Sequence, residues 1–102
     1  MSFTLKITDK FSSSSPITWI SNVVLVTYIS QGTREQMNNK QHSNGGAYPD
    51  FMQFADHSPE NATLSLLYVQ CDESNESHSG YYVVQTAYLL GPDGKTIERI
   101  AP

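Results

Sequence analysis

The sequence predicts an all-β domain, specifically a small antiparallel β-sandwich of five to six strands. Three features indicate this fold: an alternating apolar and polar start, a central run of β-branched and aromatic residues, and two strand-like segments near the end joined by Gly-Pro-Asp-Gly. A chain of 102 residues has the length of one domain with a single core. Residues 1–102 are therefore expected to form one globular unit.

The first two strands are predicted from periodicity and composition. Phe3, Leu5 and Ile7 alternate with polar residues, and a period of two is typical of a strand with one buried face. Residues 23–29 are almost all β-branched, aromatic or aliphatic. Such residues pack well on a pleated surface, and apolar side chains on both faces favour a central strand covered on both sides.

A closing hairpin is predicted for the end of the chain. Residues 81–90 and 95–100 are strand-like segments separated by a short turn. Pro92 presets φ within that turn, and Gly94 accepts a positive φ, so the two segments are expected to pair antiparallel. The segment 81–90 is apolar on both faces, which suggests that a second subunit covers one of them in a homo-oligomer.

Residues 62–71 fit either a strand or a helix. Pro59 occupies a favoured first helical position, and several apolar residues follow at helical spacing. Thr63, Tyr68 and Val69 instead favour a strand. The alternative fold is therefore an α+β domain in which a helix at 59–71 packs on an antiparallel sheet.

A short helix is expected to begin at Thr33. Thr33 and Gln36 have the spacing of a capping box, in which each side chain bonds the other residue's backbone N–H. Asn38 and Asn39 follow at once and are expected to end the helix after one or two turns.

The charges are unevenly distributed along the chain. The formal net charge is −4, and residues 41–94 contain no Lys or Arg. Nucleic-acid binding needs a basic surface, so this distribution argues against a nucleic-acid partner. An acidic surface instead suits a basic protein partner.

The predicted partner-binding residues combine this acidic stretch with tyrosines. Charged residues make up only 16% of the chain, and tyrosine beside Asn, Ser and Gly is typical of adaptable binding surfaces. The predicted residues are Asp50, Asp56, Glu60, Asp72, Glu73, Glu76, Tyr48 and Tyr81.

No motif predicts catalysis, a cofactor or a metal. Cys71 is the one cysteine and has no nucleophile signature around it. Two acidic segments, residues 50–60 and 72–78, contain oxygen ligands that suit calcium, but neither matches the twelve-residue EF-hand loop. We therefore expect no enzyme activity, no cofactor and no metal site.

These features favour a non-enzymatic binding protein. The first expectation is a protein–protein antagonist, such as an immunity protein, an inhibitor or a phage-encoded type, that presents an acidic surface. The alternative is a carbohydrate-binding, lectin-like domain. A single cysteine and the lack of a secretory signal or membrane-spanning run favour a soluble cytoplasmic protein.

Overall fold

The computed structural model describes residues 2–10, 17–43 and 58–102. These parts form an antiparallel sheet with little helix, which confirms the predicted all-β fold. The elements in chain order are β1 (Phe3–Lys10), β2 (Ile17–Gly32), α1 (Arg34–Ser43), β3 (Leu64–Cys71), the 3₁₀ helix η1 (Glu73–His78), β4 (Gly80–Leu90) and β5 (Thr96–Ala101).

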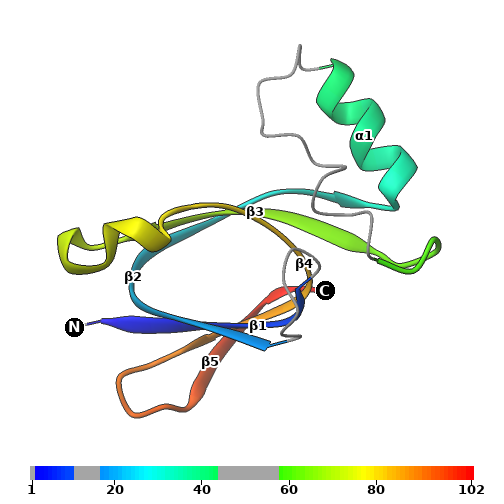
Figure 1. The fold of residues 1–102 in the computed structure, drawn as a ribbon. Helices are drawn as coiled ribbons and strands as arrows, with labels where there is room; N and C mark the ends of the chain where they lie inside the picture. Colours follow the sequence, from blue (N-terminus) through cyan, green and yellow to red (C-terminus); the bar gives the residue numbers. More distant parts are fainter. Residues whose placement is uncertain (1, 11–16, 44–57) are drawn as a thin grey trace.

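The sheet closes on itself. Its strand order is β1-β2-β3-β4-β5, and β1 also pairs with β4, so that four strands form a ring with β5 attached to β4 (Figure 1). All of these pairings are antiparallel. The two packed layers expected of a sandwich are thus two halves of one continuous sheet that face each other across the core.

The main core lies inside this closed sheet. Leu5, Ile7 and Leu67 have no exposed surface, and Ile20 is 2% exposed. They belong to one cluster with inward-facing residues of β3, β4 and β5. Burying one such aliphatic side chain stabilises the fold by roughly 1.5–3 kcal/mol.

Strand β3 is the central strand of the molecule. Four consecutive residues, 64–67, are buried, so both of its faces are covered. Leu64 and Leu66 form a second cluster outside the ring with Met37 of α1 and Val83 of β4. The strand prediction for residues 62–71 is therefore confirmed over Leu64–Cys71, and the alternative of a helix at 59–71 is wrong.

The prediction that residues 23–29 are covered on both faces is wrong. They lie within the long strand β2, where Val24 is 60%, Leu25 51% and Tyr28 44% exposed. Asn22 has a φ of 57°, and the pairing with β3 shifts register between Val23 and Leu25. This irregularity turns consecutive apolar side chains outward, which an alternation pattern does not reveal.

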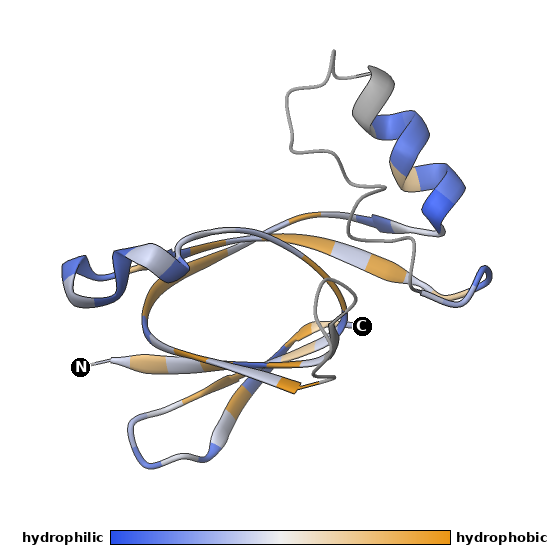
Figure 2. Cartoon of the chain, viewed as in Figure 1, coloured by the Kyte–Doolittle hydropathy of each residue, from blue (hydrophilic) through white to orange (hydrophobic). Residues whose placement is uncertain are grey.

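The predicted capping box at the start of α1 is confirmed. The Thr33 backbone N donates to Gln36 Oε1 at 3.0 Å, and the Gln36 backbone N donates to Thr33 Oγ1 at 3.3 Å. The helix continues for 10 residues, longer than expected. Among the side chains of α1 that the structure describes, only that of Met37 is buried, and most of the described helix is hydrophilic (Figure 2). None of the described helices is long and apolar enough to cross a membrane.

The predicted closing hairpin is also confirmed. Gly94 has a φ of 81°, and its N–H donates to the Gly91 carbonyl at 2.9 Å. Strands β4 and β5 pair on either side of this turn. Every residue of β4 is buried or half-buried within the single chain. The homo-oligomer suggested by its apolar faces stays a prediction.

Candidate functional site

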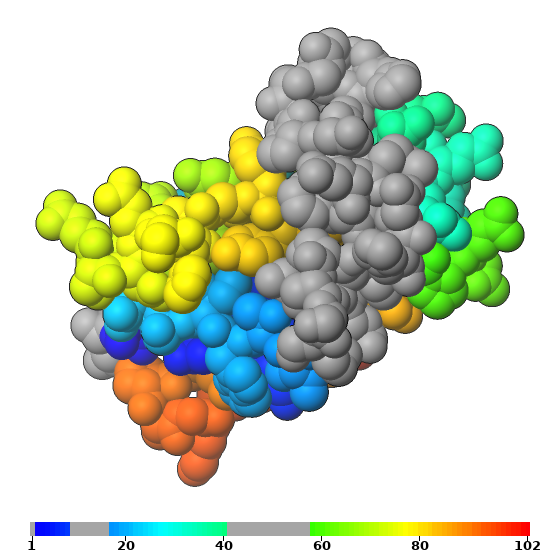
Figure 3. Space-filling model, in the orientation of Figure 1, coloured from blue at the N-terminus to red at the C-terminus, as the bar shows by residue number. Residues whose placement is uncertain are grey.

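Three of the predicted acidic residues meet at one end of the closed sheet. Asp72 directly follows β3, and Glu73 and Glu76 lie on the adjoining η1. This segment is a 3₁₀ helix with a kink at Asn75. In Figure 3 the residues around η1 are yellow and project from the molecule.

Hydrogen bonds fix η1 to the irregular point of β2. The Asp72 backbone N donates to the Asn22 carbonyl at 2.9 Å, and Asn75 Nδ2 donates to the Ser21 carbonyl at 2.7 Å. Asn22 Nδ2 also donates to Ser74 Oγ at 3.0 Å. Because these bonds join segments about 50 residues apart in the sequence, η1 is held in place by the sheet.

The fixed segment forms one wall of a surface hollow of about 520 Å³. Tyr68 and Gln70, two residues apart on β3, form another wall, since alternate side chains of a strand point to the same face. We call this feature the acidic hollow. Its lining residues are Tyr68, Gln70, Cys71, Glu73, Glu76 and Ser79.

Tyr81 supports the aromatic wall of the acidic hollow. It pairs across the strands with Tyr68, and the two rings meet edge to face with centroids 5.0 Å apart. Tyr81 is half-buried and packs against the second cluster. This contact restricts the orientation of the Tyr68 ring, so the hollow has a defined shape before any ligand arrives.

The acidic hollow carries two uncompensated carboxylates. Glu73 and Glu76 are exposed, and within the described part of the chain neither forms an ion pair with Lys or Arg. Asp72 has a different role, because its carboxylate accepts a hydrogen bond from the Ser74 backbone N at 3.0 Å and caps η1. Glu73 and Glu76 are therefore the charges available to a partner.

The remaining predicted residues do not join this group. Glu60 is exposed and lies before β3, whereas η1 follows β3. An eight-residue strand separates them, a distance of about 26 Å. Glu60 instead lines a different hollow beside the start of α1. The predicted Tyr48, Asp50 and Asp56 lie outside the described residues.

No protein-family model, curated protein or solved structure matches this chain. Its site is therefore interpreted from geometry. Two residues that sequence reasoning missed, Gln70 and Ser79, line the acidic hollow, and Tyr68 was named only as a residue that favours a strand. A firm strand assignment for 64–71 would have placed Tyr68 and Gln70 on one face. Among the described residues, no three His, Cys, Asp or Glu side chains gather as a metal site.

Burial affects two titratable groups next to η1, Cys71 and Tyr82. Loss of solvent around Cys71 raises the pKa of its thiol, so the sulfur is protonated and weakly nucleophilic at neutral pH. Burial also raises the pKa of Tyr82, whose hydroxyl donates to the His78 carbonyl at 2.6 Å. Both residues therefore act as neutral structural groups beside η1.

These shifts predict a loss of stability in alkali. In the unfolded chain, Cys71 and Tyr82 ionise near their ordinary values of 9.0 and 10.0, whereas the folded state holds their protons to higher pH. Their contribution is fully present below pH 9 and is lost as pH rises through the folded pKa values. Urea unfolding between pH 7 and 11 should show this decline.

The Tyr82→Phe variant is the control for alkaline unfolding. It removes one of the two titrations, so its free energy of unfolding should fall less steeply above pH 10 than that of the parent. At pH 7 the variant should be less stable by about 1 kcal/mol, because it lacks the hydrogen bond to His78. Equal slopes for both proteins would rule out a contribution from Tyr82.

Proposed function

We propose that this chain is a non-enzymatic protein-binding domain that receives a basic segment of its partner in the acidic hollow. The observation that supports this most strongly is that two carboxylates without an ion pair among the described residues, Glu73 and Glu76, share one hollow with the ring of Tyr68. A Lys or Arg side chain of the partner would meet both kinds of group there.

The chemistry of the hollow suits a cationic side chain in two ways. An ammonium or guanidinium group placed over the Tyr68 ring gains roughly 0.5–2 kcal/mol from the ring's quadrupole. The same cation can pair with Glu73 or Glu76, which adds about 0.2–1 kcal/mol for an exposed pair. Because η1 is already fixed to β2, little conformational entropy is lost on binding.

The proposed biological role is that of a cytoplasmic antagonist of a basic protein, as an immunity protein, an inhibitor or a phage-encoded type. A small acidic domain can occupy a basic functional surface on a larger protein, and opposite charges accelerate the encounter between them. The net charge of −4 fits this role.

A carbohydrate ligand is the second candidate. Gln70 and Ser79 place polar groups beside the Tyr68 ring, and a sugar needs both hydrogen-bonding groups and a flat apolar surface. A neutral sugar would gain little from Glu73 and Glu76 as charges. The effect of salt therefore distinguishes the two candidates.

The direct test is the binding of a hexa-arginine peptide to the whole chain, measured by calorimetry at 20 mM and 500 mM salt. We expect binding at low salt that weakens as salt rises. The Glu73→Gln/Glu76→Gln variant should bind about tenfold more weakly than the parent, a loss of about 1.4 kcal/mol. Binding that is unaffected by salt and by both substitutions would contradict the proposal.

A matched control distinguishes an effect of the two glutamates in the acidic hollow from an effect of net charge alone. Glu35 and Glu98 are also exposed glutamates, on α1 and β5, and neither lines the acidic hollow. The Glu35→Gln/Glu98→Gln variant makes the same change in net charge and should bind the peptide like the parent. A glycan array probed at 500 mM salt tests the sugar alternative, and a clear hit there would favour it.

A further inference from the structure

Four side chains from four neighbouring strands form a row that alternates aromatic and cationic groups. Lys6 of β1 lies opposite Trp19 of β2 and, on its other side, opposite Tyr88 of β4. Tyr88 in turn lies opposite Arg99 of β5. We call Trp19, Lys6, Tyr88 and Arg99 the aromatic–cationic row.

The row faces outward from the closed sheet. Adjacent residues of a strand point to opposite faces, and the neighbours of the row, Leu5, Ile20 and Ala87 among them, are buried in the main core. Trp19 is 56% exposed, Arg99 is exposed, and Lys6 and Tyr88 are half-buried. Three strand spacings separate Trp19 from Arg99, a span of roughly 14 Å.

Each cation of the row lies over one face of an aromatic ring. Lys6 Nζ is 5.1 Å from the centroid of Trp19, and the Arg99 guanidinium carbon is 5.9 Å from that of Tyr88. A flat group that stacks on the opposite face of either ring would therefore lie close to a positive charge. This combination suits a ligand in which flat rings and negative charges recur at short intervals along the molecule.

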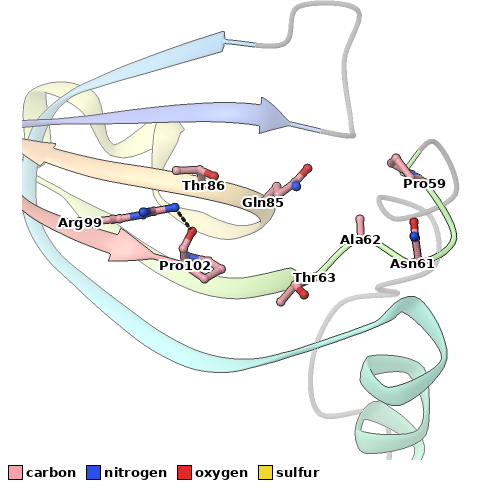
Figure 4. Close-up of a pocket in the computed structure, with 8 residues that line it drawn as sticks. All are labelled: Pro59, Asn61, Ala62, Thr63, Gln85, Thr86, Arg99 and Pro102. Carbon is pink, nitrogen blue, oxygen red and sulfur yellow. Dashed lines mark hydrogen bonds between the residues drawn. The ribbon is translucent and has the colours of Figure 1, made fainter.

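A polar hollow of about 520 Å³ adjoins the cationic end of the row. Figure 4 shows Arg99 and Thr86 on one side of it and Asn61 and Thr63 on the other. Arg99 donates hydrogen bonds to the backbone carbonyls of Ala101 and Pro102, which hold its guanidinium at the rim. Gln85 and Asn61 add side-chain amides, which can both donate and accept hydrogen bonds with base edges.

We infer that the aromatic–cationic row binds single-stranded nucleic acid. Bases stack on Trp19 and Tyr88, and the phosphates of the same strand pair with Lys6 and Arg99. One base edge reaches the side-chain amides of the polar hollow. Stacking on aromatic side chains beside backbone-tracking cations is the general mode by which proteins hold single strands. A row of roughly 14 Å corresponds to a site of about four nucleotides, at the short end of the known range.

The inference goes beyond the proposed function and uses a different surface. The sequence argues against nucleic acid because residues 41–94 lack cations, but Lys6 and Arg99 lie outside that segment and come onto one face of the sheet only in the fold. With two phosphate contacts on a single strand, the slope of log K against log salt should be about −1.4. The site is thus expected to be weak and modestly salt-dependent.

The chain contains a single tryptophan, so the fluorescence of Trp19 reports directly on the row. Titration of the whole chain with an oligothymidylate of eight nucleotides should quench this fluorescence saturably at low salt. The Lys6→Gln variant should reduce the salt slope by about 0.7. The Tyr88→Ala variant should bind roughly five- to hundredfold more weakly, and Tyr88→Phe should bind like the parent because it keeps the ring.

The matched control is Lys95→Gln, which removes the same charge from the exposed residue beside the hairpin turn. This variant should leave both affinity and slope unchanged. The inference is overturned if no saturable quenching occurs up to about 1 mM oligonucleotide, or if Lys95→Gln weakens binding as much as Lys6→Gln. It is also overturned if a duplex of the same length, or a hexa-glutamate peptide, binds at least as tightly as the single strand.

Discussion

Replacing Leu67 with Ala should lower the free energy of unfolding by about 2–5 kcal/mol, whereas Leu25→Ala should change it by less than about 0.5 kcal/mol. Both substitutions remove the same atoms from a strand residue. Leu67 has no exposed surface and lies inside the closed sheet, so its truncation leaves a cavity in the core. Leu25 is 51% exposed on β2, where water replaces the lost side chain.

Urea unfolding of the two variants, followed by far-ultraviolet circular dichroism, measures this difference. The slope of free energy against urea should be the same for both proteins, because neither change alters the surface exposed on unfolding very much. If Leu25→Ala proved as destabilising as Leu67→Ala, residues 23–29 would be covered on both faces, as the sequence suggested. That result would contradict the exposure of Leu25 on β2.

The contrast between these leucines shows where sequence reasoning failed. Residues 23–29 and 64–69 are both apolar runs of strand formers, and each is compatible with the central position in a sheet. The difference lies in partners that are remote in sequence. Strand β3 is covered by Met37 on one side and by the ring interior on the other, whereas the irregularity at Asn22 turns Val24 outward.

Structural features that depend on neighbouring residues alone were predicted correctly. The capping box of Thr33 and Gln36 and the hairpin turn at Gly94 depend on neighbouring residues alone, and both are present as predicted. The alternation of Phe3, Leu5 and Ile7 also predicted the inner face of β1, where Leu5 and Ile7 are buried. These features need no knowledge of the remote chain.

The acidic hollow was predictable only in part. Glu73 and Glu76 are close in sequence, so they had to lie close in space. Glu60 looked like a member of the same acidic surface, but an intervening strand carries it to the opposite end of the sheet. Tyr68 could not be placed beside the carboxylates while residues 62–71 were compatible with both helix and strand.

A disulfide between β1 and β4 provides the second large prediction. Thr8 and Thr86 lie opposite each other, and Thr8 Oγ1 donates to the Thr86 carbonyl at 3.4 Å. Directly opposed residues of antiparallel strands have Cα atoms about 4.5–5.5 Å apart, within the range that a disulfide spans. The Thr8→Cys/Thr86→Cys variant should therefore form the bond on mild oxidation.

This bond should raise the free energy of unfolding by about 2–4 kcal/mol, because it closes a long loop in the unfolded chain. Urea unfolding with and without reductant measures the gain. Cys71 can remain in place, since it is buried and protonated at neutral pH. The Thr4→Cys/Thr86→Cys variant is the control. Thr4 pairs with Leu90, four residues away from Thr86, so about 13 Å separates its cysteines along the strands and no bond should form.

Closure of the sheet through β1 creates the aromatic–cationic row and encloses the main core. The most direct measurement of this closure is a set of nuclear Overhauser effects from Lys6 in a uniformly labelled sample. Cross-strand contacts should connect the backbone of Lys6 with that of Trp19 and also with that of Tyr88. Contacts to Trp19 without any to Tyr88 would mean that β1 is an edge strand of an open sheet, and would contradict the closed fold.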